Sequence, residues 1–229
     1  MFQLYIGNKE SSSWSLRPWV LLSELEIPFE EHLVPFDDGG SWQKYRAFSP
    51  TGQVPCLHDG PTVVWESLAI TEYLAEAYPE IWPSDPAIRA WGRAVCAEMH
   101  SSFRVLREQR PMSVGQRWRA FSTSTPLRAD LDRIAELWQQ GLNRYGGPFL
   151  AGDRFTAVDA FFCPVAFRIQ AWALSMTPEA LAYADRLLAL ASMQKWAAAA
   201  LIEPYREPVH EQAFAALGEL IEDHRQPHS

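Results

Sequence analysis

The stretch "VPCLHDGPTVVWES", from Val54 to Ser67, combines the signals of a hairpin and of a helix start within a short length of chain. Asp59-Gly60 favours a tight turn between two short apolar runs, which predicts an antiparallel hairpin. Glu66-Ser67 then opens the run "ESLAITEYLAEAY", in which apolar residues recur at helical spacing. Because the hairpin leads directly into this run, we predict two strands followed by a helix.

The segments that precede this stretch predict a strand, a helix and a second strand. In "FQLYIG", Phe2, Leu4 and Ile6 lie on one face at period two, which is typical of a strand. From Leu16 the apolar spacing becomes helical, and the helix should end before Pro28. The run "PFEEHLVPF" that follows predicts the second strand. A strand, a helix and a strand in this order form a crossover unit, so we expect the two strands to lie parallel.

The rest of the chain has the pattern of a helical bundle. Three prolines within "YPEIWPSDP" interrupt the helical pattern, so we place a linker at residues 81–86. The predicted organisation is an α/β domain at residues 1–80 and an all-helical domain at residues 87–229. The helices expected in the second domain are Ala87 to Arg110, Pro126 to Tyr145, Ala157 to Leu174, Pro178 to Ala191, Ser192 to Leu201 and Val209 to Asp223.

Composition excludes several classes of function. The chain has 229 residues, a net charge of -8 and no Lys/Arg-rich run, so no basic face is predicted for nucleic acid. The opening residues lack a signal-peptide pattern, and no apolar run reaches the length of about 18 residues that a membrane span needs. We therefore expect a cytoplasmic protein without a membrane partner. Cys56, Cys96 and Cys163 are far apart and form no CxxC pair, and the histidines are scattered, so we expect reduced thiols and no metal site.

The combination of "ESSSWSLRPW", "TGQVPCL" and "WESLAITEYL", ahead of a helical half, resembles the cytosolic glutathione S-transferase family. The resemblance covers nearly the whole chain, and the amino-terminal motif is of a serine type similar to the zeta and omega members. It implies a thioredoxin-like amino-terminal domain that binds glutathione as co-substrate. It also implies that the all-α carboxy-terminal bundle supplies the pocket for a small hydrophobic electrophile, and that the protein is a homodimer.

The same resemblance assigns five residues to glutathione binding. It implies a cis bond between Val54 and Pro55, with the Val54 backbone pairing with the cysteinyl unit of glutathione. It gives Glu66 the ammonium group and Ser67 the carboxylate of the γ-glutamyl unit, and it places Gln53 near the ligand. The residues themselves leave other readings open: a strand-initiating proline, ordinary capping of the helix, and a glutamine in a solvent-facing loop.

Four serines within five positions, Ser11 to Ser15, raise the question of what the hydroxyls do. An ordinary thiol has a pKa of about 8.5, so a glutathione thiolate at neutral pH needs a stabilising donor. A hydroxyl at a helix amino terminus can supply that donor. Pro18 is best tolerated in a first helical turn, which predicts a helix start near Ser15, with Ser15 as the N-cap.

The resemblance narrows the choice of the serine that donates to the thiolate. Members of the zeta and omega types carry the activating residue five positions before an arginine, and counting back from Arg17 gives Ser12. Ser11 and Ser13 remain alternatives, as does a polar turn without chemistry. The motif departs from the zeta type at Trp14, where that type has a cysteine, which puts the zeta isomerase activity in doubt.

Two features of the helical half are assigned to structure. Thr156 followed three residues later by Asp159 predicts a capping box at a helix start. Arg104, Arg107 and Arg110 share one helix face, which we interpret as a solvated face, with a role in an anion-attracting pocket as the alternative.

Three functions are compatible with the sequence. The first is a glutathione transferase that activates the thiol to conjugate or reduce small electrophiles, a detoxification activity. The second is a glutathione-dependent isomerase of the zeta, maleylacetoacetate type. The third is a non-catalytic glutathione-binding or interaction module that keeps the fold.

Overall fold

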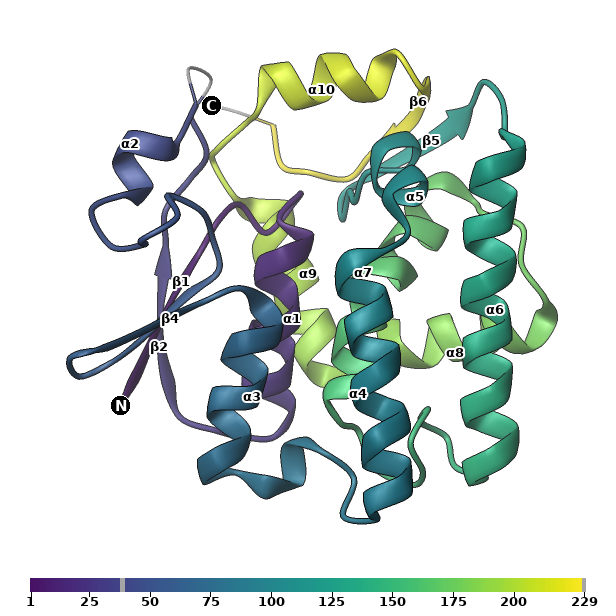
Figure 1. The fold of residues 1–229 in the computed structure, drawn as a ribbon. Coiled ribbons are helices and arrows are strands. Elements are labelled where there is room, and N and C mark those ends of the chain that lie inside the picture. The colour runs from purple at the N-terminus through teal and green to yellow at the C-terminus, as the bar shows by residue number, and fades with distance from the viewer. Residues whose placement is uncertain (38–39, 228–229) are drawn as a thin grey trace.

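The computed structural model describes residues 1–37 and 40–227. Figure 1 shows a sheet with its helices on one side of the molecule and a group of long helices on the other, and α10 and β6 lie at one end. The elements, in chain order, are β1 (Phe2–Ile6), α1 (Ser13–Glu24), β2 (Phe29–Leu33), α2 (Trp42–Tyr45), β3 (Cys56–Asp59), β4 (Thr62–Trp65), α3 (Ser67–Ala77), the 3-10 turn η1 (Pro79–Ile81), α4 (Pro86–Ser101), α5 (Arg104–Gln109), β5 (Gln116–Ala120), α6 (Thr125–Tyr145), α7 (Ala157–Trp172), α8 (Pro178–Leu188), α9 (Ala191–Ile202), α10 (Pro208–Ala215) and β6 (Gly218–Asp223).

The four-stranded sheet has the order β2-β1-β3-β4. β1 and β2 run parallel, as the crossover unit predicts, while β3 runs antiparallel to both β1 and β4. Leu4 lies opposite Leu57, and both side chains are fully buried together with Ile6. The thioredoxin-like α/β domain and the hairpin predicted from the sequence are therefore confirmed.

The start of α1 differs from the sequence prediction. The helix begins at Ser13 with Ser12 as its N-cap, so the prediction of Ser15 as N-cap is wrong. The hydroxyl of Ser15 instead accepts a hydrogen bond from the backbone N–H of Gly7, at 3.2 Å, and is not available to cap. Pro18 consequently lies inside the helix, where its missing N–H removes one internal hydrogen bond.

α7 forms the centre of the helical half. Almost all of its side chains are buried, and it packs against α1, α4, α8 and β5. The capping box at its start is confirmed, since the Asp159 carboxylate accepts a hydrogen bond from the N–H of Thr156 at 3.0 Å. Asp159 also accepts from the N–H of Leu150 at 2.9 Å and from the hydroxyl of Tyr183 at 2.7 Å. One buried carboxylate thus ties the start of α7 to the preceding loop and to α8.

The second half is helical as predicted, but two predicted helices differ from the structure. The segment at residues 87–110 divides into α4 and α5, because Phe103 adopts a positive φ of 58° that ends the first helix. The segment Val209 to Asp223 holds α10 and then β6, which pairs with β5. A side chain at Gly218 would meet the carbonyl oxygen of Arg119 at 2.7 Å, so glycine permits this close pairing. The carboxy-terminal region is therefore a helical bundle with a two-stranded ribbon.

The predicted linker coincides with the passage from η1 into α4. Ile81 and Trp82 are buried in the core there, so this passage is packed against the protein. The domain limits at residues 80 and 87 stay a prediction. Across the residues that the structure describes, no helix is both long and apolar enough to cross a membrane.

We expect Asp159→Ala to lower the free energy of unfolding by about 3 to 5 kcal/mol, because it leaves buried donors on three other residues without an acceptor. Urea unfolding followed by circular dichroism measures this loss. Tyr183→Phe removes only one of these donors, so we expect a loss of about 1 kcal/mol. Equal losses in the two variants would contradict the central role of Asp159.

Candidate functional site

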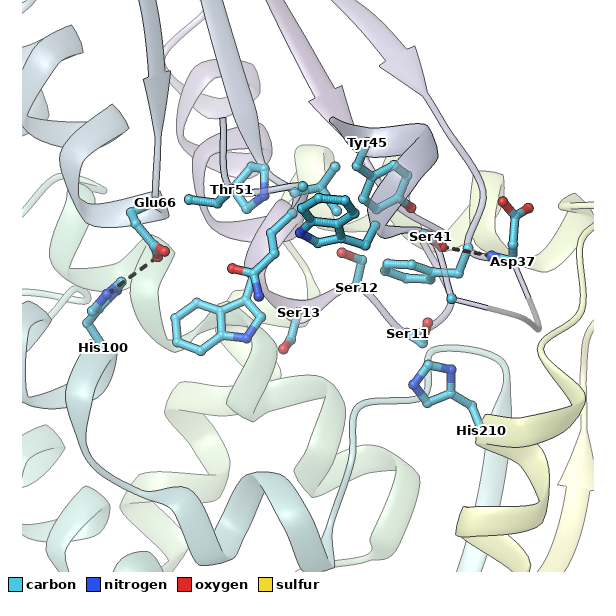
Figure 2. Close-up of a pocket in the computed structure, with 18 residues that line it drawn as sticks. Ser11, Ser12, Ser13, Asp37, Ser41, Tyr45, Thr51, Glu66, His100 and His210 are labelled. Atoms are coloured by element: carbon cyan, nitrogen blue, oxygen red, sulfur yellow. Dashed lines mark hydrogen bonds and ion pairs between the residues drawn. The ribbon is translucent and has the colours of Figure 1, made fainter. Parts of the chain in front are cut away.

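A cleft of about 710 Å³ opens at the amino ends of α1 and α3. Figure 2 shows the three serines along its floor, with Glu66 and His100 at one end and His210 at the other. Its lining comes from the start of α1, the loops around α2, the segment before β3, and single residues of α4 and α10. The lining residues are Ser11, Ser12, Ser13, Trp14, Phe36, Asp37, Gly40, Ser41, Trp42, Tyr45, Thr51, Gly52, Gln53, Val54, Pro55, Glu66, His100 and His210.

The backbone of the loop after β1 places the serines at the cleft. The carbonyl oxygen of Asn8 accepts hydrogen bonds from the N–H groups of Ser11 and Ser12, at 3.3 and 2.8 Å. The side chain of Asn8 also accepts from the N–H of Phe36 at 2.8 Å. Asn8 therefore joins the loop after β1 to the loop after β2, which lies across the cleft from the helix start.

Ser12 stands at the N-cap of α1 and makes no capping bond with its side chain. Its hydroxyl lies 2.8 Å from the hydroxyl of Ser15, to which it donates, and Ser15 is fully buried. Ser15 also accepts from the N–H of Gly7, so Gly7, Ser15 and Ser12 form a short chain of hydrogen bonds that ends at the cleft. A hydroxyl pair can reverse its direction, so Ser15 can donate to Ser12 when Ser12 donates to a ligand.

Ser11 is engaged by the carboxy-terminal segment. Its hydroxyl donates to Oε1 of Glu207 at 2.5 Å, and the other oxygen of Glu207 contacts Nδ1 of His210. The hydrogen bond with Glu207 raises the pKa of His210. The proton of Ser11 is therefore committed to a carboxylate, and this makes Ser11 a poorer donor to an anionic ligand than its two neighbours.

The segment before β3 carries the expected backbone geometry. The peptide bond between Val54 and Pro55 is cis. Neither the N–H nor the carbonyl of Val54 bonds to any residue that the structure describes. Gly52 has a positive φ of 65°, and a Cβ there would lie 2.6 Å from Cδ1 of Trp42. A glycine is therefore required for Trp42 to lie against this loop, while Val54 presents free backbone groups beside the cleft.

Glu66 and Ser67 form the start of α3. Glu66 is the N-cap and has a φ of 68°, a backbone conformation that costs about 1 to 3 kcal/mol in a residue other than glycine. Ser67 is 1% exposed, and its hydroxyl bonds to no residue within the described part of the chain. The Glu66 carboxylate lies 3.7 Å from Nε2 of His100, and burial together with nearby Arg17 lowers the pKa of His100. A strained residue and an unpaired hydroxyl thus meet at one helix amino terminus.

The structure brings the predicted site residues together around one cleft. Ser11, Ser12, Ser13, Gln53, Val54, Pro55 and Glu66 line it, and Ser67 lies directly behind Glu66. Sequence reasoning missed the contributions of Phe36, Tyr45, His100 and His210. No local pattern marks these four, because the fold carries them to the cleft from elements distant in the chain. Among the described residues, no group of three or more His, Cys, Asp or Glu side chains is placed to hold a metal ion.

Comparisons with known proteins agree on one family. The sequence model described as "Glutathione S-transferase, N-terminal domain" matches residues 11–77. A probable maleylacetoacetate isomerase of Caenorhabditis elegans is 25% identical over 178 residues, which cover 76% of this chain and 82% of that protein. A glutathione S-transferase of Hypomyces subiculosus is 27% identical over 185 residues, which cover 74% of this chain and 84% of that protein.

A solved structure extends the similarity to both halves of the chain. A glutathione transferase homologue from Burkholderia, solved with bound glutathione, is 25% identical with a TM-score of 0.65. The match covers 87% of this chain and 97% of that one. Residues 11–77 therefore carry the amino-terminal domain of the glutathione S-transferase family, and the chain is similar to glutathione transferases over both halves.

We expect Glu66→Gly to be more stable than Glu66→Ala by about 1 kcal/mol, because only glycine adopts the positive φ of this N-cap without strain. Urea unfolding of the two variants measures the difference. Both variants lose the same carboxylate, so the difference in their stability reports the strain of the backbone at this position. An alanine variant at least as stable as the glycine variant would show that the backbone at this position is not strained.

Proposed function

We propose that the protein is a glutathione transferase that ionises the glutathione thiol at Ser12 and transfers it to a small hydrophobic electrophile. One observation carries the proposal: Ser12 lines the same cleft as Val54 and Glu66, which belong to a later segment of the chain, and this cleft is large enough for a tripeptide. The cleft provides a separate partner for each part of such a ligand. The similarity to glutathione transferases supports the same activity.

The start of α3 suits the γ-glutamyl end of glutathione. A helix amino terminus offers backbone N–H groups and a positive dipole end, which favour a carboxylate. The unpaired hydroxyl of Ser67 adds a donor there, and the Glu66 carboxylate is a partner for the ammonium group. The free backbone groups of Val54 suit the cysteinyl amide, in the manner of an added strand, and Gln53 lies beside them on the same loop.

The start of α1 suits the thiol. Lowering a thiol pKa by about two units takes about 2.7 kcal/mol. A hydrogen bond to a charged group contributes about 1.5 to 3 kcal/mol, and a helix amino terminus adds about 0.3 to 1 kcal/mol. Ser12 can provide both effects, because its hydroxyl is a hydrogen-bond donor located at the amino terminus of α1, and the buried Ser15 can donate to it in turn. Ser11 and Ser13 remain the alternative donors.

The remaining parts of the proposal follow from the similarity to glutathione transferases and from the position of the cleft. The electrophile occupies the cleft beside the thiol, against the wall that the helical half contributes. The working unit is a homodimer in the cytoplasm, and the reaction serves detoxification. Glutathione is the co-substrate, and the residues proposed for the reaction need no metal.

We expect Ser12→Ala to raise the pKa of bound glutathione by about one to two units, because it removes a hydrogen bond to the thiolate. At a pH below both values, kcat/KM should then fall by about 10- to 100-fold. Ultraviolet absorbance of the thiolate, titrated against pH with saturating glutathione, measures the shift.

Ser67→Ala is the matched control, since it should raise the KM for glutathione while leaving the pKa of the bound thiol low. An unchanged pKa in Ser12→Ala would move the donor role to Ser13 or Ser11. Glutathione that binds the wild-type protein with an ordinary thiol pKa would instead identify a binding module.

A glutathione-dependent isomerase is the second candidate, because the relative from Caenorhabditis elegans is named a probable maleylacetoacetate isomerase. The start of α1 has Trp14 where the zeta motif has a cysteine. We therefore expect isomerisation of maleylacetone to be slower than conjugation of an aryl halide. Parallel assays with glutathione test this order, and the reverse order would favour the isomerase.

A further inference from the structure

Arg168 of α7 is buried beneath the serines without an acidic partner. It is 3% exposed and forms no ion pair within the described residues. Its Nε donates to the carbonyl oxygen of Arg110 at 2.9 Å, and its Nη1 donates to that of Pro164 at 3.2 Å. The third bond runs from Nη2 to the hydroxyl oxygen of Ser13, at 3.2 Å. A buried cation therefore contacts a side chain that lines the cleft.

Arg17 of α1 adds a second buried cation nearby. It is 1% exposed, and its Nε and Nη1 have no hydrogen-bond partner within the described part of the chain. Its guanidinium lies 4.2 Å from the ring centroid of Trp14 and 4.9 Å from that of Phe161. Burial lowers the pKa of both arginines to about 9, so both are charged at neutral pH.

Burying a cation is unfavourable unless an anion or dipoles compensate it. The chain has 28 acidic residues, yet none of them pairs with Arg168 or Arg17 in the described structure. The carbonyl oxygens and rings around them supply only part of the compensation. An anion that arrives at the adjacent cleft would supply more, which makes this arrangement favourable for a bound thiolate.

We propose that Arg168, acting through Ser13, is a positioning residue that keeps the thiol of bound glutathione ionised. This inference rests on the proposed transferase function. Ser13 accepts from Arg168, and no described residue accepts the proton of its hydroxyl, so this proton can point into the cleft that Ser13 lines. A hydroxyl polarised by a cation is a stronger donor than a neutral one. Ser12 remains the direct donor, and Arg168 supplies positive potential behind it.

The other charged groups around the cleft favour such a source of positive potential. Acidic groups near the serines raise the pKa of a thiol there, whereas cations lower it. The groups that face the serines, besides Arg168, are Arg17 on α1, Asp37 after β2, Glu66 before α3, His100 on α4, Arg107 on α5, and Glu207 and His210 at the start of α10. Two of the residues that line the cleft, Asp37 and Glu66, are acidic, and the buried arginines offset their effect on the thiolate.

The test is the thiolate titration of bound glutathione in three variants. Arg168→Met removes the charge and should raise the thiol pKa by about one unit, which lowers kcat/KM about tenfold at a pH below both values. The deficit should vanish at a pH above both values, where the thiol is ionised in either protein. Arg168→Lys keeps the charge and should retain most of the wild-type pKa. Ser13→Ala should raise the pKa as well, because it removes the side chain through which Arg168 acts.

Arg104→Met is the matched control, since it removes an arginine from an exposed position of the same half. We expect it to leave the thiol pKa unchanged. A wild-type thiol pKa in Arg168→Met or in Ser13→Ala overturns the inference. Should Arg168→Met fail to fold, Arg168→Lys and Ser13→Ala still decide it. A raised pKa in Ser12→Ala but not in the Arg168 or Ser13 variants would remove this inference alone, whereas an absence of glutathione binding would remove the proposed function itself.

Discussion

The cleft depends on how the amino end of α1 is held between the sheet and α7. From the sheet side, Gly7 donates its N–H to Ser15, and Asn8 accepts from the backbone that precedes the helix. From the other side, Arg168 donates to Ser13. These contacts fix the position and rotation of the first turn, because Ser15 is held from the sheet side and Ser13 from the α7 side. Without these hydrogen bonds, no partner would fix the direction in which the serine hydroxyls of the first turn point.

The helical half has two functions at this site. It forms the wall of the cleft through residues such as His100 and His210, and it supplies charge beneath the floor. The buried carboxylate of Asp159 holds the start of α7, so the helix that carries Arg168 has a fixed position. The residue that holds α7 in place, Asp159, and the residue that supplies the charge, Arg168, therefore lie on the same helix. A change that loosens the start of α7 would also shift the charge beneath the serines.

Some sequence predictions were wrong or incomplete for physical reasons. Ser15 did not cap α1, because a backbone N–H from the sheet claims its hydroxyl. The segment Val209 to Asp223 did not form one helix, because β5 offers its end a pairing edge that local periodicity does not reveal. The three arginines predicted to share a solvated helix face differ in exposure: Arg104 is exposed, Arg107 is half-buried, and Arg110, just after α5, is buried against Trp172.

The sequence alone determined the strand, helix, strand and hairpin order of the amino-terminal half and the capping box at Asp159, and its motifs indicated Ser12, Val54 and Glu66 for the cleft. These features follow from local periodicity, turn chemistry and motif spacing, which act over a few residues. Only the tertiary structure decided which partner each serine has, since Glu207 and Arg168 are more than 150 residues away along the chain. Burial decided the rest, because the electrostatic environment of a hydroxyl depends on what covers it and not on its neighbours in sequence.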